Sequence, residues 1–481
     1  MPSISSVPLF SGPQPRTFGL AVFLALASAG CAGTNSEAEF PPVAKQWYER
    51  GEKSFRTGDL EDAELAVENA LRAAPGREET RLLAGRVALS RLDYDRSIQV
   101  LKGIDSADAS GVRGRALWYK GEVQQAADEL ELLLRDPSVK DGWAVEIVKL
   151  ARRGVGRKPF DVKGSLLAVM EMPRTGPGGL MVVPVEVDGS PSLGMIATGT
   201  AEAVVDASSS AEPSWVSLRF DDRIEVRDVP VLAKDLSGIS KQIGAPIKIL
   251  LGVNLLRHLR PTIDAAGGQF IVRTFDPPPP PAATTIRLAY ARGGGMLVRG
   301  AFGSGDTAPA CSLLVDTTLT FPVALEGAAW TKAGVPPSAL QSVQNGSGLK
   351  QGVLPSLRLG AYEVPRIPGV SSDAAVKERE DGLGVDIDGL LGSGLLGTFR
   401  VTLIDGGRSM WLEDLPAEAL IPPTPIPPVP DIDLPLEDVE GEAEEEAPPA
   451  KGKAGQKAPA AKPKAPAGVN APPAAGGGKQ P

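Results

Sequence analysis

Apolar and small residues recur with helical spacing from residue 44 to residue 140. Small residues form three pairs, each twelve positions apart: Gly51 and Ala63, Gly85 and Ser97, and Gly114 and Ala126. The first two pairs are offset from each other by 34 residues. A fixed period of this length indicates stacked helical hairpins, because small side chains let two helices approach closely. We therefore expect a helical repeat domain over residues 44–153, in which residues 143–153 form a capping helix.

The first of these hairpins resembles a tetratricopeptide (TPR) repeat. Trp47, Gly51, Ala63, Ala70 and Pro75 stand at the offsets of that family. Three such repeats are about the minimum for a stable stack. The resemblance implies that a protein or peptide segment binds on the concave surface of the stack. A generic array of helical hairpins is the alternative interpretation.

From residue 164 onward the apolar positions change to a period of two, which is typical of half-buried strands. Residues 180–187 alternate in this way and lead into the turn pair Asp188-Gly189. Five consecutive prolines at 277–281 indicate a semi-rigid spacer. We expect two β-rich units, over residues 164–275 and 284–414, joined by a proline linker at 276–283.

Residues 415–481 lack the apolar pattern of the preceding units. Residues 431–446 hold nine acidic residues and no basic one, whereas residues 451–481 hold six Lys and no acidic residue. Such a composition cannot bury a core, so we expect a disordered tail. The two charge blocks either contact a charged surface or only solubilise the chain.

The two β-rich units repeat three sequence blocks in the same order. Residues 193–200 correspond to 311–318, residues 217–219 to 356–358, and residues 250–256 to 390–396. Leu218 lies 34 residues before Gly252, and Leu357 lies 35 residues before Gly392. Near-equal spacing of ordered blocks indicates an internal duplication.

Each copy resembles one lobe of a retropepsin-type aspartic protease. The resemblance rests on an apolar strand that runs into Ala197-Thr-Gly or Asp316-Thr-Thr, on the later Leu-Leu-Gly turns, and on closing segments that end at Asp264 and Asp405. It implies a bilobed fold whose inter-lobe cleft holds extended peptide. The expected fold class is therefore multidomain: all-α TPR-like repeats, an all-β bilobed retropepsin-like domain, and the disordered tail.

The catalytic chemistry of that family needs two carboxylates that share one proton, one from each lobe. At the matching positions this chain has Asp316 in the second copy but Ala197 in the first. Thr318 stands where the family has Gly, and we expect its branched side chain to crowd the backbone there. The motif is therefore incomplete in both copies.

Two functions follow from this pattern. The first is a protein-binding or peptide-binding scaffold whose protease-like domain is inactive, with Asp316 an inherited residue held by backbone hydrogen bonds. The alternative is an active, divergent aspartic peptidase that uses Asp316, either by pairing two chains or with help from Asp206. We expect a surface turn at Asp206, and we favour the scaffold, so the chain is more a pseudoenzyme than an enzyme.

The remaining motifs are weaker evidence for a function. Residues 392–397 read Gly-x-Gly-x-x-Gly, but they close a β-rich unit and not the βαβ unit that a dinucleotide site needs. We expect His258 to be peripheral and Cys311 to be a small buried side chain. With one His and two Cys, a zinc site and a Ser-His-Asp triad are excluded, and no cofactor is implied.

The beginning of the sequence indicates export. Phe18–Ala29 is an apolar run of 12 residues, too short to span a bilayer, and it leads into Ser-Ala-Gly-Cys31. This segment resembles a bacterial lipobox, which implies a signal peptide over residues 1–30, lipid attachment at Cys31 and a spacer over 31–43. An ordinary signal peptide is the alternative. The expected location is the bacterial cell envelope, as an outer-membrane lipoprotein facing the periplasm.

The net charge of -9 leaves no basic footprint for nucleic acid. The expected partners are a protein or peptide, at the repeat surface or in the inter-lobe cleft, and the membrane through the lipid anchor.

Overall fold

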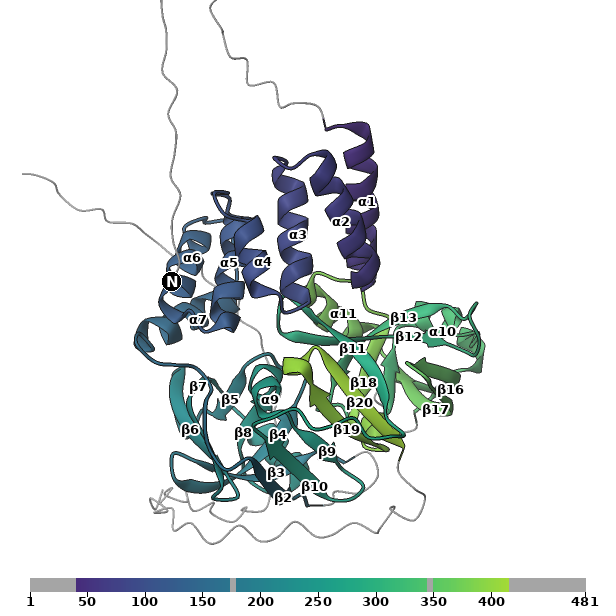
Figure 1. Cartoon of the computed structure of the whole chain (residues 1–481). Helices are drawn as coiled ribbons and strands as arrows, with labels where there is room; N and C mark the ends of the chain where they lie inside the picture. The colour runs from purple at the N-terminus through teal and green to yellow at the C-terminus, as the bar shows by residue number, and fades with distance from the viewer. Residues whose placement is uncertain (1–39, 174–178, 344–348, 415–481) are drawn as a thin grey trace, which may run out of the picture. The chain divides into compact units, whose positions relative to one another are not determined.

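The computed structural model describes residues 40–173, 179–343 and 349–414. The predicted signal peptide, lipid attachment at Cys31 and disordered tail lie outside these ranges. The described part begins with seven helices (Figure 1): α1 (Pro42–Arg56), α2 (Leu60–Ala73), α3 (Glu78–Ser90), α4 (Tyr94–Val100), α5 (Ala107–Lys120), α6 (Val123–Leu134) and α7 (Gly142–Arg153). Within these ranges, no helix is both long enough and apolar enough to cross a membrane.

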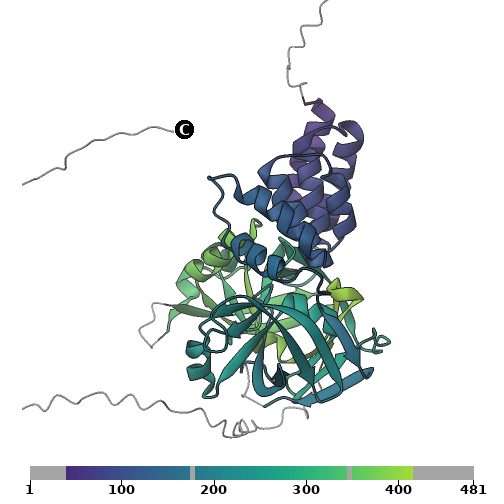
Figure 2. The ribbon, with the colours of Figure 1, turned by 90° about the vertical axis from the view of Figure 1, so that its left-hand side faces the viewer.

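Side-chain caps define where several helices begin. Asp59, Asp93, Ser106 and Asp141 each accept a hydrogen bond from the backbone N–H three residues later. Such a cap satisfies a donor that the first helical turn leaves unpaired. The helices pair as hairpins, which Figure 2 shows after a 90° turn.

The predicted small residues lie where paired helices cross. A Cβ added at Gly85 would lie 2.6 Å from the Leu101 side chain, and one at Gly114 would lie 2.6 Å from Leu130. The Ser97 hydroxyl donates to the Gly85 carbonyl oxygen at 2.9 Å. These contacts confirm the helical hairpins and explain why their crossings select small residues.

The first β-rich unit, called lobe 1 below, spans residues 161–273. It contains β1 (Asp161–Gly164), β2 (Leu167–Glu171), β3 (Val182–Val187), β4 (Ser190–Ala197), β5 (Ala203–Asp206), β6 (Ser214–Phe220), β7 (Ile224–Lys234), α8 (Ser237–Ile243), β8 (Ile247–Gly252), α9 (Val253–Leu259), β9 (Thr262–Asp264) and β10 (Gln269–Arg273). The turn after β3 has positive φ at both Asp188 and Gly189, as a tight hairpin requires.

The second unit, lobe 2, spans residues 284–414. It contains β11 (Thr284–Ala291), β12 (Gly295–Phe302), β13 (Ala310–Asp316), β14 (Val323–Leu325), α10 (Gly327–Lys332), η1 (Pro337–Ala339), β15 (Gln341–Ser342), β16 (Lys350–Leu359), β17 (Tyr362–Ser371), α11 (Asp373–Leu383), β18 (Gly389–Gly392), α12 (Ser393–Leu396), β19 (Phe399–Ile404), η2 (Asp405–Gly407) and β20 (Ser409–Asp414). The lobes are therefore mainly β, whereas the sequence prediction was all-β; short helices α8 to α12 are the additions, and α11 is the longest of them.

The strand pairing repeats in the two lobes and confirms the predicted duplication. β4 pairs parallel with β8 as β13 pairs with β18, and β5 pairs parallel with β7 as β14 pairs with β17. In register, Ala197 lies opposite Gly252 and Asp316 lies opposite Gly392. Ala197 and Asp316 thus occupy the same place in the two copies.

A continuous sheet joins the lobes. β19 of lobe 2 pairs with β9 of lobe 1, within the strand order β11-β20-β19-β9-β10-β2. Across this seam the hydroxyls of Thr262 and Thr402 lie 2.8 Å apart, and the Arg400 guanidinium donates twice to the buried Asp264 carboxylate, at 2.8 and 3.0 Å. The lobes are therefore held by backbone pairing and by a buried charge.

The helices contact both lobes. On lobe 1, the indole N–H of Trp215 donates to the Leu150 carbonyl oxygen at 2.9 Å, and the indole ring fills the space beside Gly154. On lobe 2, the Ser312 hydroxyl donates to the Thr57 carbonyl oxygen at 2.8 Å. One apolar cluster combines residues of α1 to α3 with residues of β13, β14, β17 and β18. The repeat helices and the lobes thus share part of their core.

Candidate functional site

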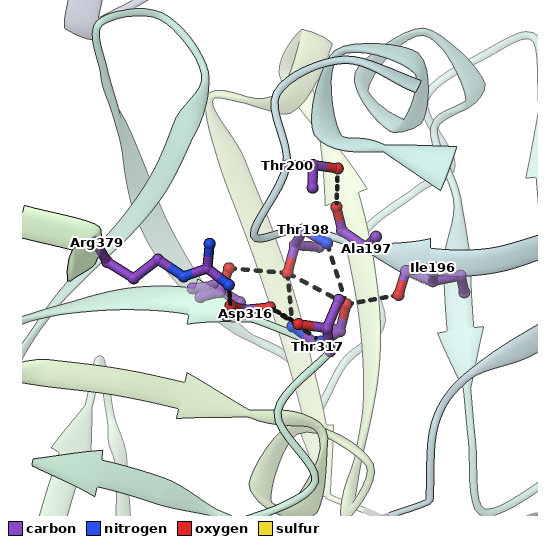
Figure 3. A network of polar contacts seen from close by, with 9 residues as sticks. Ile196, Ala197, Thr198, Thr200, Asp316, Thr317 and Arg379 are labelled. Carbon is purple, nitrogen blue, oxygen red and sulfur yellow. Dashed lines mark hydrogen bonds and ion pairs between the residues drawn. The ribbon is translucent and has the colours of Figure 1, made fainter. Parts of the chain in front are cut away.

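The ends of β4 and β13 meet through two threonines that exchange hydrogen bonds. The Thr198 amide donates to Thr317 Oγ1 at 3.1 Å, and the Thr317 amide donates to Thr198 Oγ1 at 3.1 Å. Each hydroxyl also donates across the lobe boundary: Thr198 Oγ1 to the Val315 carbonyl oxygen at 2.9 Å, and Thr317 Oγ1 to that of Ile196 at 2.8 Å. Both threonines are buried. Figure 3 shows these side chains pointing toward each other.

This symmetric exchange fixes the residues that precede each threonine. Ala197 and Asp316 are both fully or almost fully buried, at 0% and 2% exposure. Two carboxyls at these positions would be brought close together by the network. The chain places a methyl group at one of these matching positions and a carboxylate at the other.

The Asp316 carboxylate accepts three hydrogen bonds. Its Oδ1 accepts from the Thr318 amide at 3.0 Å and from the Thr318 hydroxyl at 2.6 Å. Its Oδ2 accepts from Arg379 Nη2 at 3.1 Å. In Figure 3 Arg379 approaches Asp316 from the side opposite to Thr317. Thr318, which we expected to crowd the backbone, instead supplies two of the three hydrogen bonds.

Lobe 1 closes against the same carboxylate. A Cβ added at Gly199 would lie 2.4 Å from Asp316 Oδ1 and 2.6 Å from its Oδ2. Glycine is therefore required at residue 199 for the loop to approach the carboxylate this closely. The Asp316 side chain is only 3% exposed.

The arrangement is unsuited to the two-carboxylate mechanism. That mechanism needs one carboxyl protonated to donate and the other ionised to activate water. Here the hydrogen-bond partners of Asp316 in the described residues are Thr318 and Arg379, and neither of them is a second carboxyl. The assignment of Asp316 as catalytic remains a prediction.

The other candidate residues lie elsewhere. Asp206 ends β5, where its carboxylate accepts from the Leu236 amide at 3.1 Å and pairs with Lys248 at 3.5 Å. His258 Nδ1 lies 2.7 Å from the Asn254 carbonyl oxygen. Cys311 is buried on β13, as expected, and burial raises the pKa of its thiol to about 12.

The glycines of the 392–397 motif serve local packing. Gly392 and Gly394 lie against the backbone carbonyls of the loop that follows Asp316. The motif joins β18 to the four-residue helix α12, so it has no βαβ unit around it. Within the described ranges no group of three or more His, Cys, Asp and Glu side chains could hold a metal ion.

Arg379 is a site residue that the sequence analysis missed. It lies on α11, whose first turn is capped by the Ser372 hydroxyl and whose end is marked by Gly384 at φ 71°. A polar residue before the segment and a glycine after it are sequence signals for a helix. Those signals could have located α11, but not the contact of Arg379 with Asp316 across 63 residues.

A second buried polar group links the repeat helices to the same loop of lobe 1. The Glu202 carboxylate accepts from the Trp143 indole N–H at 3.2 Å and from the Asn254 side-chain amide at 3.3 Å. Burial raises the pKa of Glu202, partly offset by those donors. Through Trp143, α7 is thus connected to the loop that begins at Thr198.

Two cavities border the repeat helices. The larger, about 620 Å³, lies between the α1–α2 turn and the strands β11 and β12 of lobe 2. The other, about 430 Å³, is lined mainly by residues of α3, α5 and the α6–α7 connection, with Arg292, Leu383 and Gly384 of lobe 2. Asp316 and Ala197 line neither cavity.

No protein-family model matches the chain, and no curated protein matches it. Among solved structures the chain is similar to the Arabidopsis OM64 TPR domain, at 14% identity and a TM-score of 0.22, over 23% of this chain and 95% of that one. It is also similar to a retropepsin-like aspartic protease from Rickettsia conorii, at 21% identity and a TM-score of 0.21, over 27% and 90% of the two chains. A third similarity is to the aspartic proteinase from Irpex lacteus, at 12% identity and a TM-score of 0.35, over 52% and 97%.

These similarities are to a TPR domain and to aspartic proteases, each over at most 52% of this chain and at low TM-scores.

Proposed function

We propose that this protein binds protein or peptide segments without hydrolysing them. The observation that carries the proposal is the state of the Asp316 carboxylate, where the ends of β4 and β13 meet. Asp316 is bonded to Arg379 and Thr318, and its symmetric counterpart is Ala197. A positioned acid or base contributes about 10² to 10⁴-fold to a rate, and the missing second carboxyl supports a loss of that contribution.

The repeat helices supply the binding surface in this proposal. Their cavity of about 430 Å³ combines buried apolar side chains with charged ones at its edge. Mostly apolar concave sites with a few convergent polar groups are typical of ligand binding. The inter-lobe cleft remains a second proposed place for an extended peptide.

The proposed location is the bacterial cell envelope, with a lipid on Cys31 as the membrane anchor. A Cys31→Ser variant should then move from the membrane fraction to the soluble fraction of the periplasm. Equal fractionation of the variant and the parent would contradict the lipid anchor and leave the binding proposal untouched.

The binding proposal is tested with the full chain and a random decapeptide library. We expect peptides to be retained by the protein at their full length, and we expect an Asp316→Ala variant to retain the same peptides. Shortened peptides that appear with the parent and not with the variant would favour the alternative, a divergent aspartic peptidase.

A further inference from the structure

The cavity of about 430 Å³ is built by two parts of the chain together. Helices α3 and α5 and the α6–α7 connection contribute most of its wall, and lobe 2 adds Arg292 from the β11–β12 hairpin with Leu383 and Gly384 from the end of α11. Leu89, Val112 and Leu133 form a buried apolar part of that wall. The cavity beside the repeat helices is therefore completed by lobe 2.

The cations of this cavity exceed its anions. Arg86 pairs with Asp108 at 3.4 Å, and Arg115 pairs with Asp141 at 2.6 Å. These pairs leave two further cations in the cavity wall, Arg292 and Lys140. In the described part of the chain neither one makes a hydrogen bond or an ion pair through its side chain.

Arg292 stands at a position that suits glycine better. It lies at the tip of the β11–β12 hairpin with φ 49°, a conformation that L side chains rarely adopt. The turn is closed by hydrogen bonds from Gly293 and Gly294 to the carbonyl oxygens of Tyr290 and Ala291, at 2.9 and 3.0 Å. The turn thus holds Arg292 at the wall of the cavity in spite of its backbone strain.

The surroundings of Arg292 favour an added negative charge. Partial burial lowers the pKa of the Arg292 guanidinium, and the nearby Arg115 lowers it further, whereas the carboxylates of Asp141 and Asp108 offset only part of this lowering. A carboxylate bound between these cations would relieve both effects, because it pairs with the guanidinium and offsets the repulsion.

We propose that this composite cavity binds an acidic peptide segment. A carboxylate of the peptide pairs with Arg292 and Lys140, and a neighbouring apolar side chain of the peptide packs on Leu89, Val112 and Leu133. The inference rests on the proposed function and adds the chemistry of the partner. In this inference, lobe 2 contributes to the specificity of the cavity beside the repeat helices.

The test uses fluorescein-labelled decapeptides and the full chain. One pool alternates acidic and apolar residues, a second has the matching amides in place of the acids, and a third has Lys in their place. We expect the acidic pool to bind about tenfold tighter than the amide pool, by fluorescence anisotropy at low salt. Equal binding of the two pools, or tighter binding of the Lys pool, overturns the proposal.

Two substitutions of arginine by glycine separate the effect of the lost charge on binding from an effect on folding. Arg292→Gly removes the cation and relieves the positive φ, so we expect an unchanged or higher urea midpoint together with about tenfold weaker binding of the acidic pool. Arg366→Gly is the matched control, because Arg366 is also an exposed arginine of lobe 2 with positive φ, at 55°, and it does not line the cavity. We expect that control to bind like the parent.

The outcomes distinguish this inference from the function on which it rests. Binding of the acidic pool that Arg292→Gly leaves intact overturns the composite acidic site and leaves a non-hydrolytic binding protein. Cleavage of any pool contradicts the proposed function itself. Absence of binding by all three pools overturns the acidic site.

Discussion

The threonine exchange between β4 and β13 is open to a direct test by Thr317→Val. Valine has nearly the shape of threonine, so the substitution removes the hydroxyl with little change in packing. The Thr317 hydroxyl accepts from the Thr198 amide at 3.1 Å and donates to the Ile196 carbonyl oxygen at 2.8 Å. The Thr198 amide and the Ile196 carbonyl belong to buried residues, since Thr198 is 3% exposed and Ile196 is 0% exposed.

A buried group left without its partner costs about 1–3 kcal/mol, so two such groups give about 2–6 kcal/mol for Thr317→Val. Thr198→Val should cost about the same, because its hydroxyl makes the mirror-image bonds to the Thr317 amide and the Val315 carbonyl oxygen. The double variant should cost less than the sum of the two single ones, since the network is shared.

The assay is urea unfolding followed by tryptophan fluorescence, with the slope m compared between variants. Thr331→Val is the matched control, because Thr331 is exposed and its hydroxyl bonds to the Gly327 carbonyl oxygen within α10, and a surface change of this kind stays within about 0.5 kcal/mol. A Thr317→Val effect as small as that of the control would refute the claim that this exchange fixes the ends of β4 and β13.

Three further predictions concern buried charges and side chains. Arg400→Met removes two hydrogen bonds from the buried Asp264 carboxylate, and we expect a loss of about 1.5–3 kcal/mol in urea unfolding; no loss would contradict the role given to that seam. Cys311 has a pKa of about 12 and is 2% exposed, so it should resist alkylation at pH 8 until urea is added. Burial lowers the pKa of His258 from 6.5 to about 4. As the pH falls, the unfolded chain therefore binds a proton at His258 before the folded chain does. Stability should fall as pH drops from about 6.5 toward 4, a dependence that His258→Gln should flatten.

The repeated pattern of each lobe could be predicted because it depends on residues that are close together in the sequence. Three blocks align the two copies, and the structure places their members in matching registers. Leu218 lies opposite Val187 as Leu357 lies opposite Phe302. Apolar alternation and turn residues select strands, and the duplication doubles the evidence for each one. The helical repeats were predictable for the same reason, since their period and small crossing residues are features of short segments.

The contacts that decide the chemistry could not be predicted in this way. Arg379 reaches Asp316 from a helix 63 residues away, and Trp143 reaches Glu202 across 59 residues. Local capping signals specify that α11 forms, but they do not specify the surface on which it packs. Which side chains meet at the junction depends on the packing of whole elements. The alignment of the two copies showed that Ala197 stands where a second carboxyl is expected. It could not show that Asp316 forms an ion pair with Arg379.

The central claim is that the junction of the lobes does not hydrolyse peptides. Its most direct test is a time course of unlabelled library peptides with the parent chain and with Asp316→Ala, from pH 4 to 7, read by mass spectrometry. We expect no new peptide termini above the buffer background for either protein, because Asp316 is held by Arg379 and has Ala197 as its counterpart. New termini that form with the parent and vanish with Asp316→Ala would contradict the account.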